Sequence, residues 1–386
     1  MALIAFVYQR APGSSLQIAK ILSFTIIPVF LIGPIAGAYV DRWERRRTMF
    51  TCDFVRAFLV LSIPLFLFYS KNLIPIYCII FIVFSLSRFF VPAKLSIIPD
   101  IVDKKDLLLA NSLVNTTGMI AAVLGFGISG VIVEWLGAKG GFYLDALSFL
   151  ISGTFIFLIV KKNGPHLTVQ NISKDIMEVI QKSVFQDIKE GLSYFLKEKG
   201  IRFTAIIMFI LWAALGSVYV VSIVFVQKTL QSATKDLGLL VMFLGMGLLA
   251  GSLIYGRFGQ RICEYKIIFT SLISSGIMLV VFAIGIDRYP CFSVAALLAF
   301  LLGISISPIM IASNTIIHNI SENHMMGKIF SSMEIVMHLG FLIFMLISSF
   351  LAEKIPPIYI LIFVGCFFGI LGASNLIYNR KKPWLN

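Results

Sequence analysis

Two pairs of charged or titratable side chains stand at helical spacing inside apolar stretches of the chain. Asp53 and Arg56 are three residues apart in "TCDFVRAFLV", and Glu334 and His338 are four apart in "SSMEIVMHLGF". Residues at these spacings share one face of a helix. Asp53 and Arg56 therefore predict an ion pair within one helix or a charged functional site. A carboxylate beside an imidazole can titrate near neutral pH, as proton handling requires, or can be a satisfied polar contact between helices.

These charges stand out because the chain as a whole is strongly apolar. Its 386 residues are 59% hydrophobic and only 13% charged, with a mean hydropathy of +0.95. A soluble domain is about 45–50% apolar and about 25% charged. The composition predicts a polytopic protein embedded in a lipid bilayer, where a charge inside a span is costly and is a candidate for function.

Two more charges are candidates for coupling residues within spans. Arg88 follows the apolar core of a predicted span, so its head group could also simply extend to the membrane surface. Asp145 lies about one turn into another apolar run. It could be a gate group near the outer surface, or a carboxylate at a helix start, where the helix dipole favours negative charge.

The apolar runs set the number of helices. A run of about 20 residues is needed to cross a bilayer. About eleven runs qualify, at 17–40, 48–69, 73–93, 107–135, 140–160, 201–227, 236–256, 265–286, 290–312, 327–351 and 356–378. The preceding "MALIAFVY" is too short to span, and we expect it to be the tail of a twelfth helix whose beginning is missing.

The basic residues indicate the orientation. With the "DRWERRR" loop placed in the cytoplasm, most of the 32 Lys and Arg residues fall on that side, and both chain ends become cytoplasmic. The net charge of +13 is then explained by membrane topology. Because the basic residues occupy short breaks between spans, we expect no binding of nucleic acid.

One long polar interval divides the chain. We expect a bundle over 1–160, a cytoplasmic linker over 161–200 and a second bundle over 201–386. An apolar stripe recurs every three or four residues within the linker, at Ile176, Ile180, Val184, Ile188, Leu192 and Phe195. It predicts an amphipathic helix on the cytoplasmic face, or alternatively a charged surface segment with no further role.

An internal repeat supports the two halves. "GAYVDRWERRR" from Gly37 aligns with "GSLIYGRFGQR" from Gly251, each at the end of an apolar run. Asp41 faces Tyr255 in this alignment, so the second copy is degenerate. Parallel repeats of this kind recur in transporters, with the substrate at their interface near the membrane midplane.

The first copy of the repeat resembles the best-known signature of the major facilitator superfamily, Gly-x-x-x-Asp-Arg-x-x-Arg-Arg, with Glu44 where Gly is usual. The matching residues are Gly37, Asp41, Arg42, Arg45 and Arg46. In that family the matching Asp holds the cytoplasmic side shut against the eleventh helix, so the resemblance implies a conformational latch at Asp41. The arginines could serve topology alone by meeting anionic lipid.

Further stretches resemble the bacterial branch of this superfamily that contains macrolide-type drug exporters and the enterobactin exporter. They are "DFVRA", "SRFFVPAKLSIIPDIV", "LLLANSL", "FYLDALSFLIS" and "GKIFSS". A separate stretch, "GFGISG", resembles the antiporter glycine motif of the superfamily, with Phe126 where Pro is typical. The resemblance implies an all-α protein of two six-helix bundles with the first helix incomplete. It also implies a monomeric secondary transporter of the bacterial plasma membrane, which exports an amphipathic small molecule in exchange for protons.

Two alternatives stay open: a siderophore or metabolite exporter of the same fold, and a truncated membrane protein that does not transport. We expect no metal, no cofactor and no enzymatic activity, because the five cysteines are isolated and no nucleophile–base constellation or P-loop occurs. "GFGISG" also fits a dinucleotide fingerprint, but it lacks the required βαβ context. Close helix packing by small residues explains it better.

Overall fold

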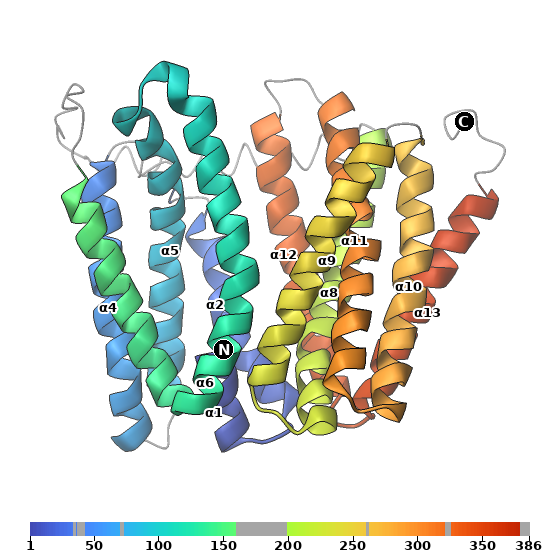
Figure 1. Cartoon of the computed structure of the whole chain (residues 1–386), viewed down its shortest axis with the longest axis horizontal. Helices are drawn as coiled ribbons and strands as arrows, with labels where there is room; N and C mark the ends of the chain where they lie inside the picture. Colours follow the sequence, from blue (N-terminus) through green and yellow to red (C-terminus); the bar gives the residue numbers. More distant parts are fainter. Residues whose placement is uncertain are drawn as a thin grey trace.

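The computed structural model describes residues 1–33, 36, 43–69, 73–159, 199–259, 262–320 and 326–378. All regular secondary structure in these ranges is helical, which confirms the predicted all-α class (Figure 1). The first half contains α1 (Ala2–Arg10), α2 (Ser15–Leu31), α4 (Arg45–Tyr69), α5 (Ile74–Ile101), the short 3-10 helix η1 (Lys104–Asp106) and α6 (Leu107–Leu158). The second half contains α8 (Lys199–Leu230), α9 (Lys235–Phe258), α10 (Glu264–Arg288), α11 (Phe292–Ile320), α12 (Met326–Leu351) and α13 (Pro357–Tyr378).

The helices account for every apolar run predicted from the sequence. Nine helices in the described ranges are long and apolar enough to cross a membrane. One of them, α6, has 52 residues and contains two of the predicted runs, while α2 is shorter, at 17 residues. The polytopic membrane architecture is therefore confirmed.

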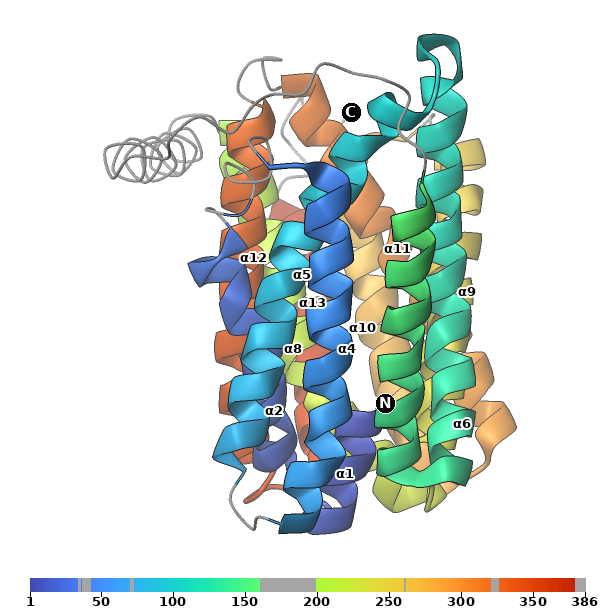
Figure 2. The same cartoon turned by 90° about the vertical axis from the view of Figure 1, so that its left-hand side faces the viewer.

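The helix α6 reverses direction at a single residue. Gly137 has φ +72° and ψ 174°, a backbone conformation that glycine adopts without a Cβ clash. It separates a first arm (107–136) from a second arm (138–158), which run side by side in Figure 2. The sequence predicted a break of several residues at this point, so the observed turn is tighter than expected.

One predicted boundary is wrong. The helix α5 continues to Ile101 instead of ending at residue 93, with Pro92 and Pro99 inside it. Membrane helices tolerate proline because neighbouring groups can satisfy the freed backbone carbonyls. The helix α2 ends at Leu31, and most of the rest of the predicted run to residue 40 lies outside the described residues.

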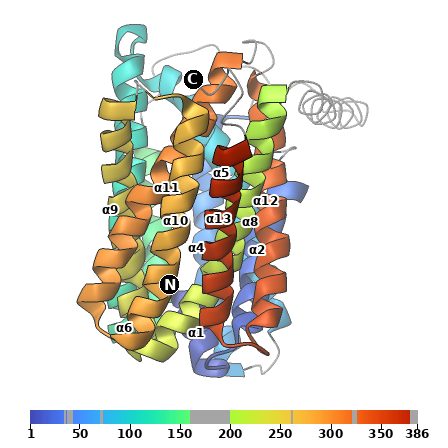
Figure 3. The same ribbon diagram turned by 90° about the vertical axis from the view of Figure 1, so that its right-hand side faces the viewer.

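The helices form two bundles. One contains α1, α2, α4, α5 and α6, and the other contains α8 to α13, which lie together in Figure 3. The main contacts between the bundles are those of α6 with α9 and of α2 with α12. The two-bundle plan is confirmed, whereas the predicted linker helix falls within 160–198, outside the described residues.

One hydrophobic core joins the bundles. It combines buried residues of the first bundle, such as Ile18 and Val133, with Val220 of α8, Leu237 of α9 and Met345 of α12. The starts of α2 and α9 lie at the same end of the molecule as the reversal of α6, at the bottom of Figure 1. We call this the Gly137 end, and the opposite end, where α4 begins, the Arg45 end.

Candidate functional site

The predicted pair of Asp53 and Arg56 is a buried ion pair in α4. An Arg56 Nη2–H donates to Asp53 Oδ1 at 2.5 Å. The two residues are only 1% and 5% exposed, respectively. A buried charge needs an oppositely charged or hydrogen-bonded partner, because desolvation alone is strongly unfavourable. The spacing in the sequence predicted this contact correctly.

The ion pair is held by two neighbouring helices. Ser152, on the second arm of α6, donates its hydroxyl to Asp53 Oδ2 at 2.6 Å. Arg56 Nη1–H donates to the hydroxyl of Ser87 on α5 at 3.2 Å, and Arg56 Nε–H donates to the main-chain oxygen of Cys52 at 3.2 Å. The network therefore joins α4, α5 and α6 within one bundle.

Two aromatic rings enclose the guanidinium. The Cζ atom of Arg56 lies 4.5 Å from the ring centre of Phe90 and 4.8 Å from that of Phe149. A desolvated cation–π contact stabilises by about 2 kcal/mol. Sequence reasoning did not identify Ser87, Ser152, Phe90 or Phe149 as partners, although all four stand in the family-like stretches that it singled out.

The arginines of the signature motif make specific contacts at the Arg45 end. Arg45 Nη1–H donates to Asp100 Oδ2 at 3.0 Å and to the main-chain oxygen of Ser96 at 2.9 Å. Arg46 Nη1–H donates to the main-chain oxygen of Ile159, just beyond α6, at 2.9 Å. The two side chains thus tie the start of α4 to the ends of α5 and α6.

The other residues of the signature, Gly37, Asp41 and Arg42, lie outside the described residues. The latch at Asp41 therefore stays a prediction.

Glu334 and His338 lie on one face of α12, as predicted, but the contact differs from a carboxylate–imidazole pair. His338 Nδ1 lies 2.8 Å from the main-chain oxygen of Glu334. A carbonyl oxygen only accepts, so Nδ1 carries the hydrogen in this contact. The imidazole also packs against the ring of Trp212 on α8, with 5.1 Å between ring centres.

Arg88 and Asp145 take no part in the hydrogen bonds around the Asp53–Arg56 ion pair. Arg88 Nε is buried and has no hydrogen-bond partner in the described part of the chain. Asp145 borders a cavity of about 360 Å³ in the first bundle, which Ser129 and Phe142 also line.

An apolar cavity of about 240 Å³ lies within the second bundle. All six helices from α8 to α13 contribute side chains to its wall. Nearly all of the lining side chains are apolar, and Tyr219, Ser222 and Ser275 supply the hydroxyl groups. The sequence did not predict this cavity, because its lining residues follow the same pattern as any buried helix face.

The model of the Major Facilitator Superfamily matches residues 1–234 and 204–384 of the chain. Among curated proteins, the chain is 28% identical to the uncharacterized MFS-type transporter YkuC of Bacillus subtilis, over 78% of the chain and 69% of that protein. It is 23% identical to the multidrug efflux pump Tap of Mycolicibacterium fortuitum, over 82% and 76%. It is 19% identical to macrolide efflux protein A of Streptococcus pyogenes, over 92% and 85%.

Solved structures share the fold at low sequence identity. A bacterial homologue of the iron transporter ferroportin, in an inward-facing state, has a TM-score of 0.71 at 14% identity, covering 96% of the chain and 93% of that protein. A POT family transporter in complex with 5-aminolevulinic acid has a TM-score of 0.70 at 14% identity, covering 98% and 92%. The relatives in both comparisons are transporters and not enzymes. Because the family model matches the chain along nearly the whole length of the chain, the chain belongs to the major facilitator superfamily.

Proposed function

We propose that the chain exports amphipathic small molecules across the bacterial plasma membrane by alternating access, in exchange for protons. The observation that carries this proposal is the apolar cavity in the second bundle. Drug-binding sites are mostly apolar, with a few polar groups that orient the ligand. The hydroxyls of Tyr219, Ser222 and Ser275 are such groups. The names of two relatives, a multidrug efflux pump and a macrolide efflux protein, agree with this substrate class.

The size of the cavity refines the proposal. A volume of 240 Å³ lies below the roughly 300–1,000 Å³ of typical ligand pockets. An apolar cavity of about 150 Å³ already binds benzene. In this conformation the cavity therefore accommodates a ring system or an alkyl portion of a substrate, and the rest of the substrate would lie outside it.

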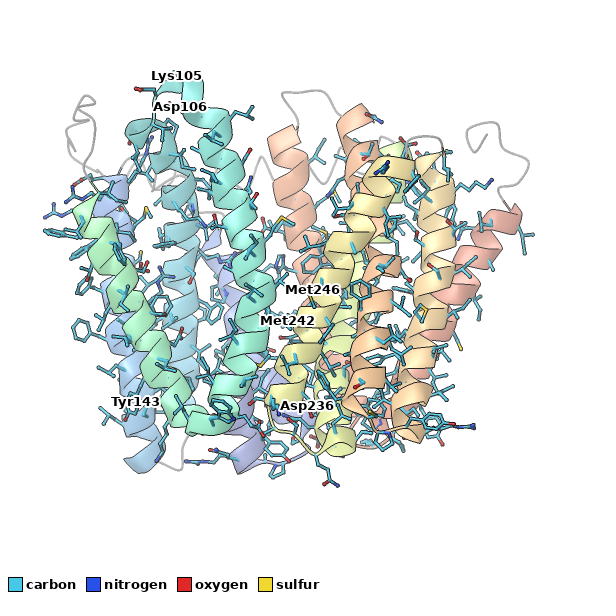
Figure 4. All side chains as sticks on the ribbon, in the orientation of Figure 1. Lys105, Asp106, Tyr143, Asp236, Met242 and Met246 are labelled. Atoms are coloured by element: carbon cyan, nitrogen blue, oxygen red, sulfur yellow. The ribbon has the colours of Figure 1, made fainter. Side chains whose placement is uncertain are left out.

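The orientation follows from the positive-inside rule. Arg45, Arg46 and Arg47 lie at the end of the molecule that we assign to the cytoplasm, together with Lys105 (Figure 4). The end of α13 then lies on the cytoplasmic side (Figure 1), whereas Met1 lies inside the first bundle, where it lines a cavity with Gly141 and Asp145. The Gly137 end faces outward.

The proton carrier that we propose is His338. Imidazole is the side chain suited to proton exchange under physiological conditions, and the hydrogen bond from Nδ1 to the main-chain oxygen of Glu334 holds the ring in one orientation. Arg88 is a candidate coupling residue of another kind, a fixed cation, because its buried Nε has no hydrogen-bond partner in the described part of the chain and it lies in a predicted span.

An efflux assay with a filled cavity tests the proposal. Ala299 lines the cavity and is 4% exposed, whereas Leu297, two residues away on α11, is 59% exposed. We expect Ala299→Phe to abolish export of a lipophilic fluorescent dye from bacterial cells, and Leu297→Phe to leave it intact. Wild-type export by Ala299→Phe, at equal amounts of protein in the membrane, would show that the cavity does not receive the substrate.

The energy source is tested in the same cells. An uncoupler should abolish the export, because it removes the proton gradient. Export that continues undiminished in the presence of the uncoupler contradicts proton exchange. A complete absence of export by the wild-type chain, for dyes of several charges, favours the non-transporting alternative.

A further inference from the structure

The N-terminus of α9 receives a carboxylate from the opposite bundle. Glu134 stands near the end of the first arm of α6. Its Oε2 accepts the main-chain N–H of Thr234 at 2.8 Å and that of Lys235 at 3.2 Å. The Thr234 hydroxyl lies 3.0 Å from the same oxygen. Thr234 is the N-cap residue of α9, so this carboxylate satisfies donors that a helix start leaves without partners.

The N-terminus of α2 receives a carboxylate in the reverse direction. Glu353 follows the end of α12, and its Oε1 accepts the hydroxyl of Ser14 at 2.6 Å and the main-chain N–H of Leu16 at 3.3 Å. Ser14 is the N-cap residue of α2 and accepts the N–H of Gln17 at 3.3 Å. A side chain of the second bundle thus completes the cap of a helix in the first.

The two contacts are counterparts under the internal repeat. In the internal repeat, the segment from Gly37 follows α2, and the aligned segment from Gly251 forms the end of α9. The helix α2 is therefore the counterpart of α9. The first arm of α6 packs against α9, and α12 packs against α2. In each case the carboxylate comes from the helix of the opposite bundle, at or just beyond its end. The same contact is made twice, once in each direction across the interface.

Close packing supports the first of these contacts. A Cβ atom at Gly130 would lie 2.6 Å from the main-chain oxygen of Thr234, and one at Gly238 would lie 2.5 Å from that of Phe126. Further along α9, Met242 reaches toward α6 (Figure 4). A Cβ atom at Gly127 of α6 would lie 2.7 Å from the Sδ atom of Met242. The backbones of α6 and α9 therefore touch directly beside Glu134.

The physical basis is the charge at a helix start. The N-terminus of a helix carries roughly half a positive charge, and a carboxylate placed there is attracted to it. Hydrogen bonds to an ionised acceptor are also shorter and stronger than neutral ones. Both caps lie at the Gly137 end, next to the hydrophobic core that the two bundles share. Separation of the bundles at this end would break both caps.

We propose that Glu134 and Glu353 form a paired lock that holds the Gly137 end closed. The lock opens when both carboxylates leave the helix starts of the opposite bundle. This proposal rests on alternating access, but not on the substrate or the proton exchange proposed above. It assigns to the outward side a chemistry that the family resemblance predicted for Asp41 on the inward side.

Thiol labelling of the full chain in lipid nanodiscs tests the lock. The reporter is Val220→Cys, because Val220 is 0% exposed and belongs to the core shared by the bundles. The five native cysteines are first replaced by serine or alanine. Cys291 in particular is exposed, and the main-chain N–H groups of Ser293 and Val294 lower the pKa of its thiol, so it would react first.

We expect Glu134→Gln and Glu353→Gln each to raise the rate of maleimide labelling about fivefold, and the double variant about 25-fold, from the strength of a helix-start carboxylate. The matched control is Glu264→Gln, which changes a carboxylate in the first turn of α10, at the Arg45 end. Labelling should stay at the parental rate in this control. A double variant that labels no faster than the control overturns the proposal.

A second pair of variants covers the case in which the glutamines disturb folding. Thr234→Val keeps the carboxylate but removes one hydroxyl of the cap, and we expect about a twofold increase in labelling. The disulfide formed by oxidising Glu134→Cys/Thr234→Cys, added to the Val220→Cys reporter, should block labelling of the reporter. Labelling of the cross-linked protein at the parental rate contradicts the lock. Lock behaviour without dye export would refute only the proposed efflux.

Discussion

The two bundles build the same pair of outer helices by different means. In the first bundle, α4 packs against the second arm of α6, and the hydrogen bond from Ser152 to the Asp53–Arg56 ion pair links them. In the second bundle, α10 packs against α13, and the contact is made by glycines. A Cβ at Gly276 would lie 2.4 Å from the main-chain oxygen of Gly365.

The internal repeat makes the comparison residue by residue. With Gly37 aligned to Gly251, the positions of Asp53 and Arg56 correspond to Ile267 and Thr270. Ile267 is buried, and the Thr270 hydroxyl lies 2.9 Å from the main-chain oxygen of Lys266, within its own helix. The second bundle thus forms the same helix pair without buried charge. The ion pair is not required by the architecture, although neither charge can be removed alone.

The largest effect is expected from breaking the ion pair. Arg56→Ala leaves the Asp53 carboxylate buried without its cation, which should lower the free energy of unfolding by about 3–5 kcal/mol. The measurement is thermal unfolding of the detergent-solubilised protein, together with the amount of protein recovered from the membrane.

The control for this variant replaces both charges at once. Asp53→Leu/Arg56→Met should stay within about 1 kcal/mol of the parent, because apolar residues of similar volume can replace a buried ion pair. If the double variant is as unstable as the single one, apolar side chains cannot replace the ion pair. The first bundle would then need the charges for its stability, unlike the second.

A smaller effect is expected at the glycine contact. Gly276→Ala places a methyl group against the main chain of α13, so the helices must separate, at a cost of about 2–3 kcal/mol. Its counterpart is Gly153→Ala on the second arm of α6, where the nearest atoms, at 2.8 Å, belong to the ring of Phe54. Since a ring can turn, that variant should lose only about 1 kcal/mol. Equal losses in unfolding experiments would mean that both helix pairs depend on backbone approach.

The smallest effects separate the hydroxyl groups. Ser152→Ala removes a hydrogen bond to an ionised carboxylate and should lower the unfolding free energy by about 1.5–3 kcal/mol at most. Thr270→Val removes a hydroxyl that bonds only within its own helix, and should change stability by less than about 0.5 kcal/mol. The same denaturation measurement compares the two. A larger loss for Thr270→Val would mean that this hydroxyl also supports the contact between α10 and α13.

Sequence patterns predicted the helices and which residues share one face of a helix. The spacing of Asp53 and Arg56 indicated their ion pair, because a helix brings residues three apart onto one face. Contacts between helices were not predictable in this way. Ser87 and Ser152 come from helices whose rotation about their own axes depends on tertiary packing.

Two further features show the same limit. Helical spacing placed Glu334 and His338 on one face, but the imidazole bonds the main chain, an acceptor that every residue offers. Glu134 and Glu353 stand at the margins of apolar runs, where a charge is unremarkable. Only the three-dimensional structure shows that each one reaches a helix start of the other bundle.

The reversal at Gly137 has a mechanical consequence. The first arm of α6 carries Glu134 and touches the opposite bundle, while the second arm carries Ser152 and touches the ion pair. Only the two backbone dihedrals of Gly137 separate the arms, because no loop lies between them. A long loop would absorb a rotation of one arm, whereas this joint transmits it. A rotation of the first arm at the interface between the bundles would therefore also move the second arm, and with it the hydrogen bond from Ser152 to the buried ion pair.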